Sequence, residues 1–338
     1  MTDTAPIGVV LVNWNRWADT IEALESLLRS TVPLRVVVVD NASADGSMER
    51  IAAWAAGNNP AVAASPGMAH FTTPPLPKPI RVRRLGPEQL ASALSMPEDG
   101  LTLVDSGGNL GYAGGNNVGL GLLLTDPAIR CFWLLNNDTV VEPDTAARLA
   151  AHMDATANVG MCGTIVRYYW KPDRVQALNG YRFSFLTGSA RPINGSLPAS
   201  LPFDAREVAK ASDFVLGASL AVSRAFLETI GLMEEGYFLF YEEIDWAVRN
   251  NGRFVTAFAA DATVFHKEGG SIGSSGVPGA RSAFADYWLT RSRLAFIRRH
   301  RPVLLPWHWL LTLALVGRRL VRRQPDKART ILKALFGR

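Results

Sequence analysis

The sequence predicts an α/β fold: a mostly parallel, twisted sheet flanked by helices and followed by a basic, helical C-terminal tail. Short apolar runs, such as residues 35–39 and 131–135, have the length and pattern of strands buried on both faces. Segments with apolar residues at helical spacing separate these runs. Strands that alternate with helices predict parallel neighbours joined by right-handed crossovers.

The distribution of charge predicts the tail. The chain has 338 residues, of which 48% are hydrophobic, enough for a large core but too few for a protein that crosses a membrane many times. Residues 287–338 hold 13 Lys or Arg and one acid, a net charge of +12. Residues 1–286 hold 22 basic and 29 acidic residues, a net charge of −7. The tail therefore predicts an anionic partner surface.

Neither a disulfide nor a secretory signal is expected. Cys131 and Cys162 both lie in apolar stretches, which indicates buried thiols in a reducing compartment. The N-terminal residues lack a basic patch before an apolar run.

The first half of the chain is expected to alternate strands and helices. Ser43 or Asp45 is expected to cap the second helix. Residues 57–100 are rich in proline and predict a surface excursion around one short strand. A glycine-rich turn at residues 107–117 opens a further helix. The predicted strands here are residues 7–12, 35–39, 80–83, 101–104 and 131–135.

The second half is expected to continue the sheet and to carry a hairpin. Asn179-Gly180 is a hairpin turn signal inside the aromatic-rich residues 167–186. The aromatic rings there either stack on a sugar or pack within the sheet: Tyr168, Tyr169, Trp170, Tyr181, Phe183 and Phe185. The predicted strands are residues 159–166, 213–222, 254–258 and 262–265.

Polar residues follow several predicted strands, at the edge where ligands of open α/β sheets bind. Asp138 ends the central strand and is a hard oxygen ligand suited to Mg²⁺ or Mn²⁺ on a diphosphate. Asp40 ends the second strand, where a carboxylate can bind a ribose or a base edge. Taken alone, each position is better explained by a turn, since turns favour Asn and Asp.

The glycine-rich stretch suits close approach of the backbone to a phosphate or a nucleotide sugar. It contains neither a dinucleotide fingerprint nor a phosphate loop, since no Gly-Lys occurs in the chain. A tight structural turn is the alternative.

Two further residues have the chemistry of an active site. Glu243 follows the aromatic-rich residues 237–241, and a Glu in an apolar cleft has a raised pKa and can act as a general base. Asp245, by contrast, is explained by an i,i+4 pair with Arg249. His266 ends a strand before Gly269-Gly270-Ser271, as a metal or phosphate ligand would, although a lone His is usually structural.

Taken together, four blocks resemble the family 2 glycosyltransferases with a GT-A fold, and most closely their bacterial rhamnosyltransferase-type branch. The resemblance covers about residues 7–300. The blocks are Val39-Asp40-Asn41 with Ser43 and Asp45-Gly46-Ser47; residues 109–117; residues 135–139; and residues 231–249 followed by His266.

The resemblance implies a GT-A-like, Rossmann-like domain at residues 1–285, with a nucleotide-binding half at 1–140 and an acceptor-binding half at 141–285, before the tail at 286–338. It implies inverting transfer of a sugar, such as L-rhamnose from dTDP-rhamnose, to a glycan or lipid-linked acceptor in cell-surface polysaccharide synthesis. A divalent metal, Mg²⁺ or Mn²⁺, would assist.

The resemblance also assigns residues to roles. Glu243 would be the catalytic base, and Asp138 and His266 would bind the metal. The nucleotide-sugar pocket would hold Asn13, Asn15, Asp40, Asn109, Gly111, Tyr112, Gly114, Gly115, Asn116 and Asn137. Acceptor binding or support would fall to Glu242, Asp245 and Trp246. Two departures stand out: Asn136 replaces the first acid of the metal motif, and Glu243 replaces the usual Asp.

Other functions are open at this point. A sugar nucleotidyltransferase shares the opening pattern, but a basic glycine-rich loop for a triphosphate is missing. A non-catalytic carbohydrate-binding protein would need neither Glu243 nor Asp138. Nucleic acid is not expected as a partner, because the tail lacks aromatic–basic strand platforms.

The apolar part of the tail, residues 303–316, is shorter than the roughly 20 residues that cross a bilayer. Arginines follow it, and Trp307 and Trp309 suit the headgroup level. We therefore expect a cytoplasmic protein, peripheral on the anionic inner face of the cell membrane. The alternative is a helical pair that packs on the domain or in a homodimer.

Overall fold

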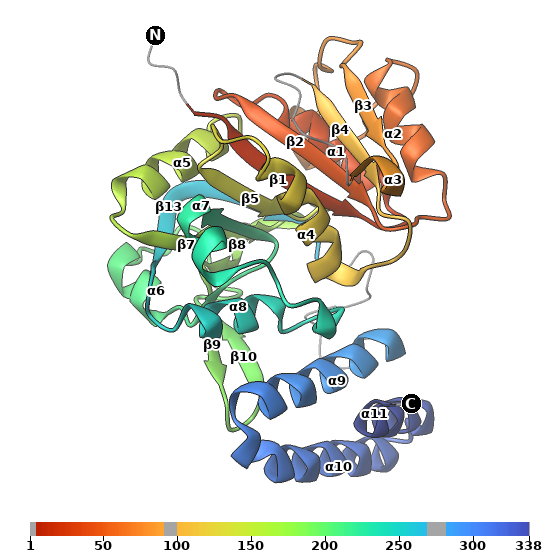
Figure 1. Ribbon diagram of the computed structural model, residues 1–338, viewed down its shortest axis with the longest axis vertical. Coiled ribbons are helices and arrows are strands. Elements are labelled where there is room, and N and C mark those ends of the chain that lie inside the picture. Colours follow the sequence, from red (N-terminus) through yellow and green to blue (C-terminus); the bar gives the residue numbers. More distant parts are fainter. Residues whose placement is uncertain (1–4, 91–99, 269–281, 338) are drawn as a thin grey trace.

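The computed structural model describes residues 5–90, 100–268 and 282–337 (Figure 1). The strands are β1 (Ile7–Asn13), β2 (Leu34–Asp40), β3 (Val82–Leu85), β4 (Leu101–Asp105), β5 (Cys131–Leu135), β6 (Thr139–Val141), β7 (Val159–Tyr168), β8 (Lys171–Leu178), β9 (Gly180–Ser184), β10 (Ser189–Pro192), β11 (Phe214–Val215), β12 (Ser219–Ser223) and β13 (Val255–His266).

The α-helices are α1 (Trp17–Leu27), α2 (Ser47–Ala55), α3 (Pro87–Leu90), α4 (Gly111–Leu123), α5 (Thr145–Ala155), α6 (Ala205–Ala211), α7 (Arg224–Ile230), α8 (Glu242–Asn250), α9 (Ala283–His300), α10 (Leu305–Val321) and α11 (Pro325–Phe336). Short 3₁₀ helices are η1 (Pro66–Phe71), η2 (Glu235–Tyr237) and η3 (Pro302–Leu304).

The large sheet has the strand order β3-β4-β2-β1-β5-β12-β7-β13-β6, with β8 beside β7. Its first five strands are parallel, and β12 runs antiparallel between β5 and β7. The predicted α/β fold with a mostly parallel sheet and C-terminal helices is therefore confirmed. The carboxyl ends of β1, β2, β5 and β13 lie at one edge of the sheet, because β13 again runs parallel to β7.

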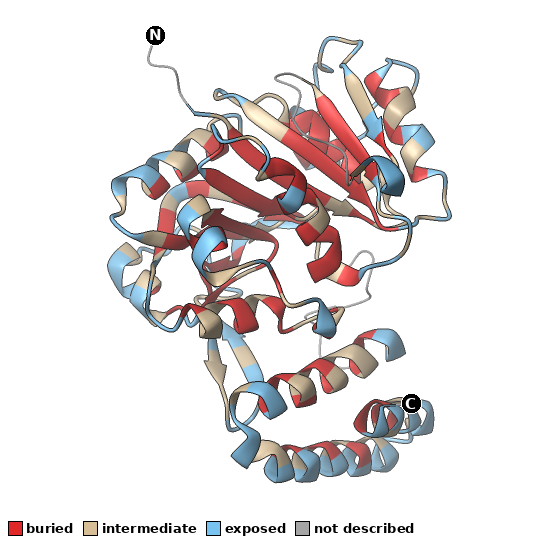
Figure 2. Cartoon of the chain, in the orientation of Figure 1, coloured by how far each residue is buried: buried red, intermediate tan, exposed pale blue. Residues whose placement is uncertain are grey.

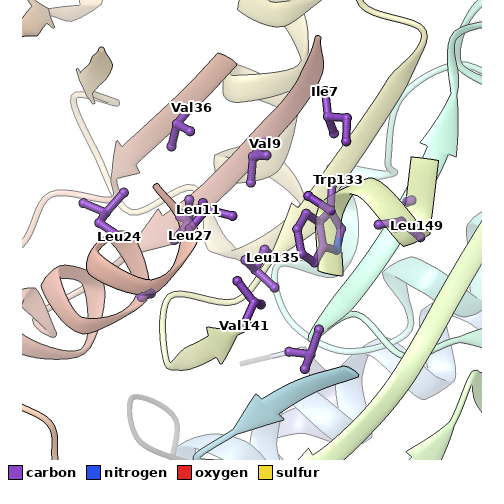
Figure 3. Packing of buried hydrophobic residues seen from close by; sticks show 14 of the residues in the cluster. Ile7, Val9, Leu11, Leu24, Leu27, Val36, Trp133, Leu135, Val141 and Leu149 are labelled. Carbon is purple, nitrogen blue, oxygen red and sulfur yellow. The ribbon is translucent and has the colours of Figure 1, made fainter. Parts of the chain in front are cut away.

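Two apolar layers bury the sheet from both sides. On one side, Val9, Leu11 and Trp133 pack against the helices that carry Leu24 and Leu149 (Figure 3). On the other side, the alternate residues of the same strands pack against α4, α7 and α8. Covered faces of this kind require the uninterrupted apolar runs seen in the sequence. Both cysteines are buried free thiols, as expected.

The predicted hairpin at Asn179-Gly180 is wrong. Strand β8 pairs with β7 in the large sheet, whereas β9 joins a small sheet of order β10-β9-β11. Asn179 adopts the left-handed conformation (φ 61°) that Asn-Gly favours, but here it turns the chain from one sheet into another. The aromatic rings of Tyr169, Phe183 and Phe185 pack inside the protein, and Trp170 is exposed.

Three further boundaries differ from prediction. The predicted strand at 213–222 divides into β11 and β12, which belong to different sheets. The two predicted strands at 254–265 are one strand, β13, with a register shift between Ala259 and Thr263. Gly46, at φ 74°, holds the N-cap position of α2, although the Asp45 carboxylate accepts from Ser47 N at 3.1 Å.

The C-terminal helices α9–α11 gather at one end of the molecule, with α9 next to the α/β body (Figure 1). Phe296 of α9 packs against Phe183 and Phe185 of the β9–β10 region, with ring centroids 5.5 and 5.6 Å apart. No helix within residues 5–90, 100–268 and 282–337 is both long enough and apolar enough to cross a membrane.

Candidate active site

A cleft of about 670 Å³ opens beside the carboxyl ends of β2 and β4. It is lined by Asp40, Ala42, Ser43, Met48, Glu49, Arg84, Leu85, Gly86, Gln89, Asp105 and Gly107. Ligands of open α/β sheets bind outside this edge.

Asp40 is fixed at the floor of that cleft. Its carboxylate accepts hydrogen bonds from Asn13 Nδ2 (2.6 Å), Ser43 Oγ (2.6 Å) and Ser43 N (2.9 Å), and only 4% of the residue is exposed. Asn15 shapes the same loop, since its N–H donates to Ser43 Oγ (2.8 Å) and its Oδ1 accepts from Ala44 N (2.7 Å).

Asn13 and Asn137 brace Asp40 and turn away from solvent. Asn13 Oδ1 accepts from Thr20 Oγ1 (2.7 Å) and from Asn137 Nδ2 (3.2 Å). Both asparagines are buried, so their amides serve this internal network. The network also joins the end of β1 to the loop that carries Asp138.

The glycine-rich stretch is helical from Gly111 onward, so the turn that opens the helix is confined to residues 107–110. Helix α4 begins at Gly111, whose φ of 70° and close contact with Phe238 O leave no room for a side chain. Asn109 Oδ1 accepts from Gly111 N (3.0 Å) just before the helix. Gly114 and Gly115 lie inside it, and their missing side chains let the helix approach Leu110, Val12 and Asn41.

Asn116 also faces inward: it is 2% exposed, and its Nδ2 donates to Tyr112 O (2.9 Å). Tyr112 reaches the centre of the site instead. Its hydroxyl donates to Gly217 O (2.7 Å), and burial together with the neighbouring Glu243 carboxyl raises the pKa of the phenol.

Asp138 and His266 form the second part of the site. Asp138 Oδ1 and His266 Nε2 are 3.1 Å apart, and both residues are 7% exposed. Burial raises the pKa of Asp138, but the charge and hydrogen bond of His266 together with the charge of Lys267 outweigh it and lower the pKa overall. Burial lowers the pKa of His266, and the Asp138 carboxylate outweighs it and raises the pKa overall.

This pair fits a divalent metal. Neighbouring ligands of an octahedral ion, each about 2.1 Å from the metal, lie about 3 Å apart, close to the observed separation. His266 Nδ1 contacts Gln176 Oε1 at 2.8 Å, which leaves Nε2 for the metal. Asn136 Nδ2 lies 3.4 Å from His266 Nε2. Among the described residues no group of three His, Cys, Asp or Glu side chains could hold a metal, so a diphosphate and water would complete the shell.

Glu243 forms the third part. A side chain at Gly217 would collide with Glu243 Oε1 and the Tyr112 hydroxyl, so these groups converge on one glycine. Burial raises the pKa of Glu243 to about 7, although hydrogen bonds from the backbone of Glu243 and Gly217 limit the rise. Gly217 lies next to Ala218, whose carbonyl accepts from Asn136 N (3.1 Å), and this contact ties Glu243 to the Asp138 loop.

Glu242 is the buried neighbour of Glu243. It is 1% exposed, and its Oε1 has no hydrogen-bond partner within the described part of the chain. Burial and the adjacent Glu243 raise the pKa of Glu242 well above its ordinary value, which favours the neutral carboxyl.

The segment before these acids has an unusual backbone. Phe238, Phe240 and Tyr241 all have positive φ, at 62°, 67° and 76°. Such conformations cost of order 1–3 kcal/mol each in non-glycine residues, and they cluster at functional sites. Ser292 of α9 holds this segment, because its hydroxyl contacts Tyr237 O (2.9 Å) and Leu239 O (2.8 Å).

Asp245 and Trp246 have structural roles. Asp245 is fully buried and contacts Arg249 Nε (2.6 Å), His300 Nε2 (2.6 Å) and the Tyr237 hydroxyl (3.0 Å). Trp246 Nε1 donates to Gly231 O (2.8 Å). Both residues therefore anchor α8, and Glu243 is the acid of this helix that lies beside Gly217.

Sequence reasoning missed two residues at this edge. Gln176, on β8, orients His266. Lys267 lies between Asp19 (2.5 Å) and Glu22 (2.6 Å) and holds the end of β13. The only sequence signal was the position of Lys267 directly after His266. The predicted Gly269-Gly270-Ser271 loop lies outside the described residues.

The arrangement of the sheet and of this edge defines a GT-A-like α/β fold. The mannosyltransferase PcManGT of Pyrobaculum calidifontis, solved with GDP-Man and Mn²⁺, is similar over 98% of this chain and 75% of its own, with a TM-score of 0.50 and 16% identity. GalNAc-T7, solved with UDP, GalNAc and Mn²⁺, is similar over 96% of this chain and 59% of its own, with a TM-score of 0.53 and 11% identity.

A curated protein is also similar in sequence. The low-salt glycan biosynthesis hexosyltransferase Agl10 of Haloferax volcanii is 28% identical over 152 residues, 45% of this chain. The match covers 46% of Agl10, so this chain spans about half the length of that relative. No protein-family profile matches the chain.

Proposed function

We propose that this protein is a nucleotide-sugar glycosyltransferase, a hexosyltransferase that works by inversion in glycan synthesis. The observation that carries the proposal is a half-buried carboxyl with a pKa of about 7, Glu243, which lies beside Gly217 near the sheet edge of Asp40 and the Asp138–His266 pair. The similar proteins named above include a glycan biosynthesis hexosyltransferase and a mannosyltransferase solved with GDP-Man, which also supports the proposal.

In this mechanism Asp40 binds the nucleoside in the cleft beside β2, and Tyr112 and Asn109 border the sugar. Glu243 takes the proton of an acceptor hydroxyl while that oxygen bonds to the anomeric carbon. The bond from the anomeric carbon to the diphosphate breaks on the opposite face, and the nucleoside diphosphate leaves. Asp138 and His266 would hold a divalent metal, which when bound neutralises charge on the leaving diphosphate.

The finer assignments follow the rhamnosyltransferase-type resemblance. We propose a deoxyhexose donor such as dTDP-L-rhamnose, a glycan or lipid-linked acceptor, and action at the cytoplasmic face of the cell membrane. A panel of nucleotide sugars, measured by thermal shift with Mn²⁺, tests the donor. A sugar nucleotidyltransferase would instead be stabilised by a nucleoside triphosphate, and a carbohydrate-binding protein would not release nucleoside diphosphate from any donor.

Metal dependence gives a prediction. Asp138→Ala should weaken Mn²⁺-dependent donor binding at least ten-fold by calorimetry, because it removes the one carboxylate of the pair. Asp261→Ala is the matched control, since Asp261 also pairs with a histidine, His152, at 2.9 Å but does not line the nucleoside cleft. Donor affinity that is unchanged in Asp138→Ala, or turnover that persists fully in EDTA, contradicts a metal at this position.

A further inference from the structure

Helix α10 buries two polar residues and exposes several of its large apolar residues. His308, Thr312 and Val316 face the protein and are 0%, 0% and 7% exposed. The large apolar side chains of the same helix and of the preceding turn point outward: Val303, Trp307, Trp309, Leu310, Leu313, Leu320 and Val321. Figure 2 shows this outward side as largely exposed. An ordinary surface helix has the opposite pattern.

The outward residues form one continuous face. Leu310, Leu313 and Leu320 recur at the i, i+3, i+10 positions of one helix side, and they are 59%, 47% and 55% exposed. Phe336 of α11, 61% exposed, extends the face, since its ring lies 6.0 Å from that of Trp309. Exposed apolar patches of this kind mark interaction sites.

Cations border the end of this face. Arg318, Arg322 and Arg323 are exposed, and no carboxylate within the described residues forms an ion pair with any of them. The one acid of residues 287–338, Asp326, lies 3.8 Å from Arg329 instead. A self-complementary dimer would bring these unpaired arginines toward each other, which costs free energy. An anionic bilayer would match both the apolar face and its basic border.

We propose that the outward face of α10, with Phe336, is the surface by which this protein lies on an anionic bilayer. The leucines enter the level of the upper acyl chains, and Trp307 and Trp309 lie at the headgroups. The arginines contact lipid phosphates. This inference rests on the proposed function in one respect: the bound protein and a membrane-bound acceptor would then diffuse to each other within the plane of the bilayer.

The test is flotation of the full chain with vesicles of phosphatidylcholine, with or without phosphatidylglycerol. We expect flotation only with phosphatidylglycerol and its loss at high salt. Leu310→Asp/Leu313→Asp should abolish flotation, and each of Arg318→Gln and Arg322→Gln should weaken it about five-fold. Leu201→Asp, an exposed leucine before α6, is the matched control and should float normally.

Two results would overturn the proposal: flotation of Leu310→Asp/Leu313→Asp equal to that of the unchanged chain, or no flotation of the unchanged chain at any salt. A lipid-independent dimer that this double variant converts to a monomer would assign the face to a second copy instead. Donor hydrolysis in the absence of lipid is measured in parallel. If the unchanged chain does not hydrolyse the donor, the proposed function is contradicted. If it hydrolyses the donor but does not float, only the membrane face is contradicted.

Discussion

Glu243→Gln should reduce turnover by about 10²–10⁴-fold, the contribution expected of a general base. The amide keeps the shape of the side chain beside Gly217 and Tyr112 but cannot accept the acceptor proton. Donor affinity should stay nearly unchanged, because Asp40 ends β2, Asp138 lies in the turn between β5 and β6, and His266 ends β13, whereas Glu243 belongs to α8. Single-turnover rates with saturating donor, together with calorimetry, separate these two quantities.

Glu242→Gln is the matched control for that variant. Glu242 is buried and its pKa is raised well above the ordinary value, which favours the neutral carboxyl, so replacing it with an isosteric amide should change turnover far less. Near-normal turnover in Glu243→Gln with a large loss in Glu242→Gln would move the base to Glu242. Asp245 is a poor alternative, since its carboxylate is taken up by three partners.

The raised pKa of Glu243 also predicts two pH dependences. Turnover at saturating donor should rise with pH and level off above about 7, where the carboxyl is ionised. Stability should change in the opposite direction: the folded pKa of about 7 exceeds the ordinary 4.5, so stability falls as pH rises from 4.5 to 7. Glu243→Gln should therefore raise the melting temperature at pH 8 but not at pH 4. If the difference in melting temperature between Glu243→Gln and the unchanged chain is the same at pH 4 and pH 8, the raised pKa of Glu243 is contradicted.

Asp245→Asn should lower the free energy of unfolding by about 3–5 kcal/mol, as expected when one partner of a buried ionic cluster is removed. The change leaves Arg249 and His300 without their shared carboxylate and loosens α8 from α9. Urea denaturation measures the loss.

Asp261→Asn is the control for this variant. Asp261 also pairs with a histidine, His152, at 2.9 Å, but both side chains are largely exposed, so the loss should stay below about 1 kcal/mol. A comparably small loss for Asp245→Asn would mean that aromatic packing around Phe296, and not the carboxylate, fixes α9 on the body.

The sequence was informative where structure follows from local pattern. Buried parallel strands need unbroken apolar runs, so the ends of β1, β2 and β5 could be predicted, and with them the shared edge of Asp40 and Asp138. His266 was found because it directly ends such a run. Apolar residues at helical spacing indicated helices between these strands for the same reason.

The sequence was uninformative where the role of a residue depends on partners far away in the chain. Gly114 and Gly115 look like a loop, but their role comes from the approach of Val12 and Asn41 on other elements. Gln176 orients His266 across 90 residues, and nothing in its own neighbourhood signals this. Likewise, the reversed sides of α10 became visible only once His308 and Thr312 were seen to face the protein.

The junction at Asn179 makes the fold sensitive to the number of residues between β8 and β9. This single residue separates β8 from β9, and its N–H and C=O bond to Thr164 O (3.0 Å) and Leu216 N (3.1 Å). One inserted residue would turn the alternating side chains of β9 to its other side. Phe183 and Phe185 would then point away from Phe296, and α9 would lose its aromatic contacts with β9 and the turn that follows it. In a scan of single-residue insertions, this position should be among the least tolerant, whereas the exposed chain around Val62 should accept them readily.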